Sequence, residues 1–163
     1  MYSVAYGNPC SVAVDPVEKK PLYHFLPGTE ILSLATAGCN LHCLNCQNWP
    51  ISQVSPLSLQ SYDMLPRQVA EMAVSCHVPS IAFTYTEPTV FYEYMFDSAV
   101  LAREKGLKTV AVSNGYINLE PLAALIPYLD AANIDLNCFD DKLYRRLTGG
   151  RLQPVLDSLL ALL

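Results

Sequence analysis

Four short apolar segments recur along the chain, separated by stretches in which apolar residues follow helical spacing. Each apolar segment ends in polar or small residues, and such near-continuous apolar runs are typical of strands buried on both faces. The segments are residues 31–37 (ILSLATA), 80–86 (SIAFTYT), 108–113 (KTVAVS) and 132–137 (ANIDLN). The pattern therefore predicts four buried strands.

The intervening stretches carry apolar residues at i, i+3, i+4 and i+7, which is the spacing of one helix face. The expected helices are one that follows Pro66, one over residues 90–105, one capped by Asn118, one that opens at Asp140 or Asp141, and a final run, QPVLDSLLALL. Strands and helices thus alternate four times, and this order implies parallel strands joined by right-handed crossovers. The sequence therefore predicts an α/β fold.

The first thirty residues have a different character. SVAV, then Asp15-Pro16, then KKPLYHF indicate two extended segments around a turn, packed outside the main unit. We therefore expect an N-terminal extended segment over residues 1–30 and a core over residues 31–163. The chain ends inside an apolar run, SLLALL, and four parallel strands leave an open edge, so we expect the core to be incomplete at its C-terminus.

Composition narrows the possible functions. The chain has 163 residues, 52% of them hydrophobic, which fits one domain with a substantial core. A formal net charge of −5 argues against electrostatic binding to nucleic acid. No apolar run reaches the length of a membrane span and no signal peptide opens the chain, so we expect a cytoplasmic protein. In that reducing compartment, the six cysteines indicate metal or cluster ligands rather than disulfides.

Polar residues follow each predicted strand. In parallel α/β folds, functional residues collect in the loops after the carboxyl ends of the strands. These loops contain the cysteines of CNLHCLNCQNW, the run Tyr85-Thr86-Glu87-Pro88, the run Ser113-Asn114-Gly115, and Asp135 with Asn137. We therefore expect these residues to surround a common site.

Three of the cysteines are spaced C-x3-C-x2-C directly after the first predicted strand. A structural zinc site takes four ligands, commonly as two C-x2-C pairs, whereas only one such pair is present and His42 would have to fold back to complete the set. A [4Fe–4S] cluster is usually held by four thiolates, so three would leave one iron open to a small chelating molecule. A catalytic cluster is the main hypothesis. A non-catalytic zinc module for structure or partner binding is the alternative.

The cysteine spacing and its position resemble the radical S-adenosylmethionine (SAM) superfamily. YGNPC and the residues through NWPISQ, with FTYTEPTVFYEY, VSNGY and LTGGRLQPVL, resemble the radical SAM enzyme of the AmmeMemoRadiSam system, which is similar to pyruvate formate-lyase activating enzymes. The resemblance implies a TIM-barrel-like (βα)6 barrel, of which this chain would supply a partial barrel of about four βα units.

The same resemblance implies an oxidoreductase that cleaves SAM reductively and abstracts hydrogen from a protein or small-molecule substrate. A one-electron donor such as flavodoxin or ferredoxin is the implied partner. Carried onto this sequence, the cluster ligands are Cys39, Cys43 and Cys46.

The resemblance also assigns the polar strand ends to SAM. Glu87, with the backbone of Tyr85 and Thr86, would receive the amino group. The remaining implied cofactor-binding positions are Ser113 and Asn114 near the methionine portion, and Asp135 near the ribose. By position alone, Glu87 fits about equally well as a strand-end carboxylate near a helix N-terminus, and the resemblance favours the SAM role.

Two positions depart from the family pattern. Asn45 stands where an apolar or aromatic residue commonly seats the adenine, and Asn137 replaces a lysine expected near the SAM carboxylate.

Overall fold

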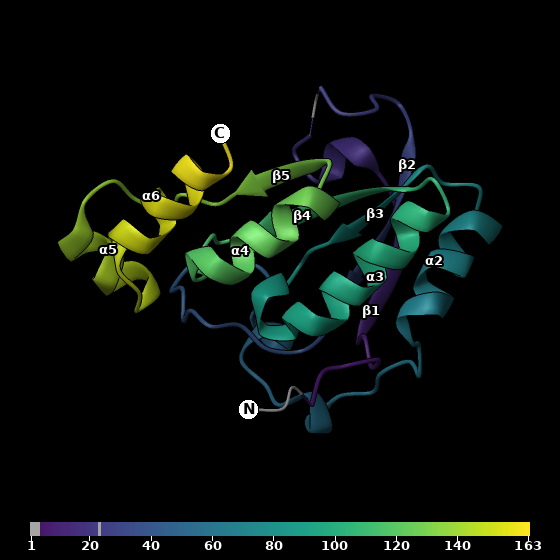
Figure 1. The fold of residues 1–163 in the computed structure, drawn as a ribbon. Helices are drawn as coiled ribbons and strands as arrows, with labels where there is room; N and C mark the ends of the chain where they lie inside the picture. Colours follow the sequence, from purple (N-terminus) through teal and green to yellow (C-terminus); the bar gives the residue numbers. More distant parts are fainter. Residues whose placement is uncertain (1–3, 23) are drawn as a thin grey trace.

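The computed structural model describes residues 4–22 and 24–163, which form one five-stranded sheet with helices packed along it (Figure 1). The strands follow one another in space in the order β1-β2-β3-β4-β5. Their bounds are β1 Ser11–Pro16, β2 Glu30–Ala35, β3 Ser80–Phe83, β4 Lys108–Ser113 and β5 Ala131–Ile134. Strands β2 to β5 are parallel, as the sequence predicts. The predicted α/β fold is confirmed.

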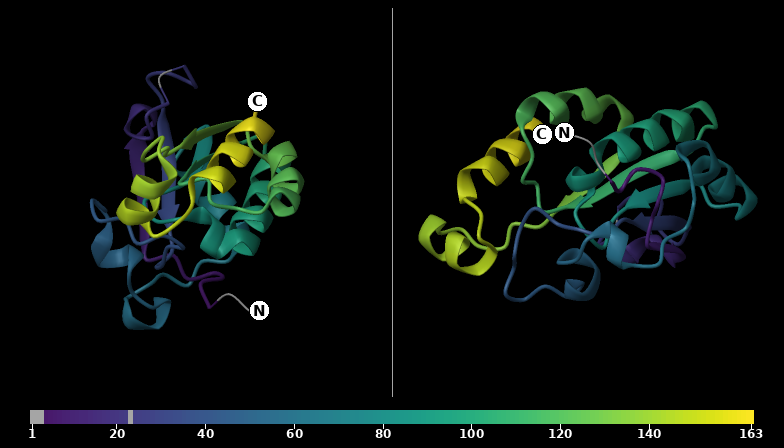
Figure 2. Two further views of the ribbon diagram at one scale, coloured as in Figure 1. Left: turned by 90° about the vertical axis from the view of Figure 1, so that its left-hand side faces the viewer. Right: turned by 90° about the horizontal axis from the view of Figure 1, so that it is seen from below.

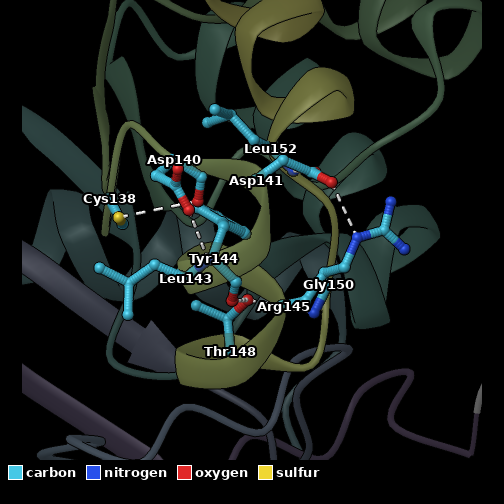
Figure 3. Close-up of polar contacts among 9 residues, drawn as sticks. All are labelled: Cys138, Asp140, Asp141, Leu143, Tyr144, Arg145, Thr148, Gly150 and Leu152. Atoms are coloured by element: carbon cyan, nitrogen blue, oxygen red, sulfur yellow. Dashed lines mark hydrogen bonds and ion pairs between the residues drawn. The ribbon is translucent and has the colours of Figure 1, made fainter.

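Six α-helices are present among the described residues. Their bounds are α1 Trp49–Ser52, α2 Pro66–Ser75, α3 Tyr92–Glu104, α4 Leu119–Leu125, α5 Asp141–Thr148 and α6 Leu152–Ala161. Short 3-10 turns accompany them at η1 Val17–Lys19, η2 Pro56–Ser58, η3 Pro88–Phe91 and η4 Ile126–Tyr128. The predicted cap of α5 is confirmed, because the Asp140 carboxylate accepts a hydrogen bond from the backbone N–H of Leu143 at 2.7 Å (Figure 3).

The prediction for the N-terminal residues is wrong in one respect. β1 does not pack outside the main unit but pairs antiparallel with β2, in a register that runs from Ser11 opposite Ala35 to Pro16 opposite Glu30. The pairing satisfies backbone groups that β2 would otherwise expose at the sheet edge. The expected second extended segment, KKPLYHF, contains Tyr23, which lies outside the described residues, and its described residues form no strand. The domain boundary at residue 30 stays a prediction.

The two faces of the sheet are covered differently. On one face, β2 and β3 pack against α2 and α3 in the main core, which includes Leu34, Phe83 and Tyr94. On the other face, Val17 of η1 packs with Ile31, Ala82 and Val110 from three strands. The N-terminal segment therefore covers part of the sheet face opposite α2 and α3. Figure 2 shows this segment on the side away from α3 and α4.

Three predicted strands end earlier than expected, and the first of them, β2, ends at Ala35 rather than at residue 37. β3 ends at Phe83 rather than at residue 86, because Tyr85 adopts a left-handed backbone conformation with φ of 65° that no strand accommodates. β5 ends at Ile134 rather than at residue 137. Polar residues that were expected within strands thus lie in the loops that follow them.

None of the described helices is long and apolar enough to cross a lipid bilayer.

Candidate functional site

A cavity of about 700 Å³ opens at the carboxyl ends of the parallel strands. Its volume lies within the range of small-molecule binding sites. All ten sequence-predicted site residues line it, namely Cys39, Cys43, Cys46, Tyr85, Thr86, Glu87, Ser113, Asn114, Asp135 and Asn137. Four loops that are distant in sequence therefore meet at one place, as the parallel topology requires.

The cysteine-bearing loop after β2 is held by backbone hydrogen bonds from several sides. The Gly38 N–H donates to the carbonyl of Ile51 at 2.9 Å, which closes the loop against α1. The N–H groups of His42 and Leu44 donate to the carbonyls of Thr148 and Leu147 at 2.8 and 2.9 Å, which fixes the loop to the end of α5. The loop is therefore positioned by the fold itself.

Two of the three thiols have polar neighbours that suit a sulfur ligand. The Cys39 Sγ accepts from the Leu41 N–H at 3.4 Å and from the Asn114 Nδ2 at 3.7 Å. The Cys46 Sγ lies 3.3 Å from the hydroxyl oxygen of Ser52. Hydrogen-bond donors directed at cluster sulfurs tune iron–sulfur centres.

Burial sets the protonation of the thiols. It raises the pKa of Cys39 to about 11 and also raises the pKa of Cys43. Metal binding must therefore release protons from both thiols. Within the described residues, no three His, Cys, Asp or Glu side chains lie close enough together to hold a single metal ion. The thiolates of a four-iron cluster each bind a different iron atom.

Glu87 is buried in the loop after β3, with 1% of its surface exposed. Its Oε1 accepts from the Ser113 hydroxyl at 2.7 Å and from the Thr89 N–H at 3.0 Å, and its Oε2 accepts from the Asn114 N–H at 2.8 Å. Burial raises the pKa of Glu87, while the backbone N–H donors oppose that change. Because donors face both oxygens, the surroundings fit the ionised form.

The Glu87 contacts extend to the cysteine loop. Asn114, which donates its backbone N–H to Glu87, also donates its side-chain Nδ2 to the Asn40 Oδ1 at 2.8 Å and to the Cys39 sulfur. Through Asn114, Glu87 thus links the loop after β3 to the end of β4 and to the cysteine loop. Its position as the N-cap of η3 agrees with the alternative interpretation of the sequence, a carboxylate near a helix N-terminus.

Replacing Glu87 with glutamine is expected to destabilise the fold by roughly 1–3 kcal/mol. Glutamine has one acceptor oxygen, so its NH2 group would face a buried donor that Glu87 now satisfies. Urea unfolding at neutral pH measures the difference, with the exposed Glu93→Gln on α3 as the matched control. Equal stabilities of the two variants would show that the buried carboxylate is not required as an acceptor.

The loop after β3 carries the remaining predicted contacts. The Thr86 hydroxyl donates to the carbonyl of Thr36 at 2.7 Å, and the Tyr85 carbonyl accepts from the Asn48 Nδ2 at 2.6 Å. The left-handed conformation of Tyr85 costs about 1 kcal/mol or more, and the Tyr85 side chain reaches β1. There its hydroxyl donates to the carboxylate of Asp15.

The N-terminal segment also contributes to the cavity, which the sequence analysis did not predict. Lys19, Lys20 and Pro21 line it. The Lys20 Nζ lies 2.7 Å from the Asp15 carboxylate and 4.2 Å from the centre of the Tyr85 ring, and Lys20 is only 2% exposed. A lysine pair beside an Asp-Pro turn resembles an ordinary solvated turn, so no local pattern distinguishes it.

The last two predicted positions follow β5. The Asp135 N–H donates to the Ser113 carbonyl at 2.9 Å, which extends the pairing of β4 with β5 beyond the strand. The Asn137 Nδ2 donates to the Asp135 carbonyl at 3.3 Å. Asn45, the other position that departs from the family pattern, also lines the cavity.

Comparisons with known proteins agree with this geometry. Residues 33–163 match the family model described as the Radical SAM superfamily. The chain is 49% identical over 158 residues to the uncharacterized protein MJ0808 of Methanocaldococcus jannaschii, covering 97% of this chain and 46% of that protein. The chain thus spans about half the length of that relative.

A solved structure, "Structure of TYW1 with a lysine-pyruvate adduct bound", has a similar fold. Its TM-score is 0.56 at 19% sequence identity, and the similarity covers 93% of this chain and 60% of that one. At that identity the likeness concerns the fold alone. The family model, by contrast, spans most of the chain. The chain therefore belongs to the radical SAM superfamily, whose enzymes use a [4Fe–4S] cluster and S-adenosylmethionine.

Proposed function

We propose that this chain forms the part of a radical SAM enzyme that holds the cluster and SAM. The observation that carries the proposal is that three cysteines and seven polar strand-end residues line one cavity of about 700 Å³. When bound, the cluster supplies one electron that splits the sulfonium C–S bond of SAM, giving methionine and a radical that abstracts hydrogen from a substrate.

The chain's own residues have distinct roles in this proposal. Cys39, Cys43 and Cys46 bind the cluster as thiolates, and the Leu41 N–H and Asn114 amide hydrogen-bond to the Cys39 sulfur. Glu87 acts as a positioning residue, because it holds Ser113 and Asn114 at the cavity wall. Polar groups of the loops after β3, β4 and β5 then orient the amino, carboxylate and ribose groups of SAM.

Residues lining the cavity also support these SAM contacts. Ser113 and Asn114 border the methionine portion, and Asp135 accepts hydrogen bonds from ribose hydroxyls. Asn137 has a neutral amide where relatives have a lysine. A different residue must therefore supply the positive charge that pairs with the SAM carboxylate. Among the described residues, the basic side chains that line this cavity are Lys19 and Lys20 of the N-terminal segment.

The finer assignment rests on the sequence motifs. We propose an enzyme of the AmmeMemoRadiSam type that resembles pyruvate formate-lyase activating enzymes and acts in the cytoplasm on a protein or small-molecule substrate. A one-electron donor such as flavodoxin or ferredoxin supplies the electron. The four separated motifs that occur in family order over residues 6–156 support this assignment.

Anaerobic reconstitution with iron and sulfide tests the proposal. We expect a brown protein with about four irons per chain, which forms methionine and 5′-deoxyadenosine from SAM when reduced with dithionite. A colourless protein that binds zinc and assembles no cluster would support the non-catalytic zinc module instead.

A further inference from the structure

The basic residues of the chain are concentrated on α5 and the turn that follows it. Residues 142–151 contain four of the ten Lys and Arg residues and no Asp or Glu, although the whole chain has a formal charge of −5. All four are exposed, and we call them the α5 basic surface: Lys142, Arg145, Arg146 and Arg151. Asp140 and Asp141 directly precede this stretch, and residues 140–151 together, with four basic and two acidic side chains, still carry a formal charge of +2 on a chain of −5.

The helical geometry directs these side chains outward. Tyr144 and Thr148 are fully buried, so they mark the side of α5 that packs against the rest of the fold. Lys142, Arg145 and Arg146 follow i, i+3 and i+4 spacing and share the opposite side. The Arg145 Nε pairs with the Asp141 carboxylate at 2.8 Å, as Figure 3 shows. Within the described residues, Lys142 and Arg146 form no ion pair.

Helix stability explains only half of this charge. Arg145 and Arg146 lie in the last turn of α5, where the helix dipole favours positive charge. Lys142 is the second residue of α5 and Arg151 is the N-cap of α6, and the dipole disfavours positive charge at both places. These two positions indicate a role other than stabilising the helices.

The α5 basic surface adjoins the cysteine loop. The His42 and Leu44 N–H groups donate to the carbonyls at the end of α5, and Figure 2 shows the loop beside that helix. A Cβ at Gly150 would lie 2.6 Å from the Leu41 side chain, so the turn after α5 packs directly on the loop. Leu44, between Cys43 and Cys46, is 75% exposed. The loop therefore reaches the protein surface next to the basic residues.

We propose that the α5 basic surface, with Leu44 beside it, docks an acidic one-electron carrier protein that reduces the cluster. The inference rests on the proposed function, which requires one electron for each SAM cleaved. The carrier loses that electron and the cluster gains it, with no bond formed between the two proteins. Opposite charges speed association and orient the partners, and a small apolar contact suits a transient complex.

The double variant Lys142→Glu/Arg146→Glu tests this docking in the full reconstituted chain. We expect its affinity for a purified, acidic flavodoxin, followed by flavin fluorescence, to fall about tenfold at low salt. SAM cleavage driven by the reduced flavodoxin should fall by a similar factor, while cleavage driven by dithionite should not change. The wild-type affinity should also decrease as ionic strength rises.

A matched control is Arg67→Glu/Lys105→Glu, which makes the same charge change at exposed positions of α2 and the end of α3. Arg67 occupies the second position of its helix, as Lys142 does in α5. If both double variants bind flavodoxin as tightly as the wild type, or lose affinity equally, the docking inference is overturned. If the wild type yields no cleavage even with dithionite, the proposed function fails first and this inference fails with it.

Discussion

A Cys43→Ala variant is expected to lose the ability to assemble a four-iron cluster while it keeps its fold. Cys43 is half-buried and lines the cavity. Removing it leaves two of the three protein thiolates, so the iron content after reconstitution should fall from about four per chain to below about one. Iron and sulfide analysis, with the visible absorption spectrum, measures the loss.

Two comparisons separate a catalytic cluster from a structural metal. Cys76→Ala removes an exposed thiol at the end of α2, outside the cavity, and should leave the cluster unchanged. The thermal midpoint of the metal-free Cys43→Ala protein should equal that of the metal-free wild type. If Cys43→Ala retains a full complement of iron, Cys43 is not a ligand. If zinc stabilises the wild type but does not stabilise Cys43→Ala, the zinc module is supported.

The strands and helices of the parallel core could be predicted because each carries its own local pattern. Buried strands such as KTVAVS have a near-continuous apolar centre that ends in a polar residue. The bounds of α5 follow from Asp140 before it and from Gly149 after it, whose φ of 79° ends the helix. The position of β1 could not be predicted in this way. SVAVDP is equally suited to a separate hairpin, and its place in the sheet depends on pairing with β2.

The candidate site was predictable to the extent that topology determines it. Parallel strands bring their carboxyl ends to one edge, so the cysteines, Glu87 and Asp135 were expected to meet before any distance was known. The position of Lys20 at the cavity wall depends instead on contacts between elements that are distant in the sequence. It pairs with Asp15, which is joined in turn to Tyr85 seventy residues away, and no spacing rule connects residues on separate elements.

Asp15 is a buried anion between two lysines and a phenol, and its titration follows from those partners. Burial alone would raise the pKa of Asp15, but hydrogen bonds from Lys19, Lys20 and Tyr85 hold it well below its usual range. A depressed folded-state pKa contributes stability above the unfolded pKa, and that contribution is lost as pH falls through the folded value. The contribution of Asp15 should therefore be complete at neutral pH and decline below about pH 4.

An Asp15→Asn variant is expected to unfold about 3–5 kcal/mol more easily than the wild type at pH 7, because it leaves the buried Lys20 ammonium without a counter-charge. Urea unfolding measures this, and Asp97→Asn is the matched control, since Asp97 also accepts a tyrosine hydroxyl, from Tyr6 at 2.6 Å, but is exposed. That control should cost less than about 1 kcal/mol. Adding Lys20→Met to Asp15→Asn should recover part of the lost stability, because it removes the unpaired charge. If Asp15→Asn is no less stable than Asp97→Asn, or if Lys20→Met recovers nothing, the ion pair does not hold the N-terminal segment against the cavity.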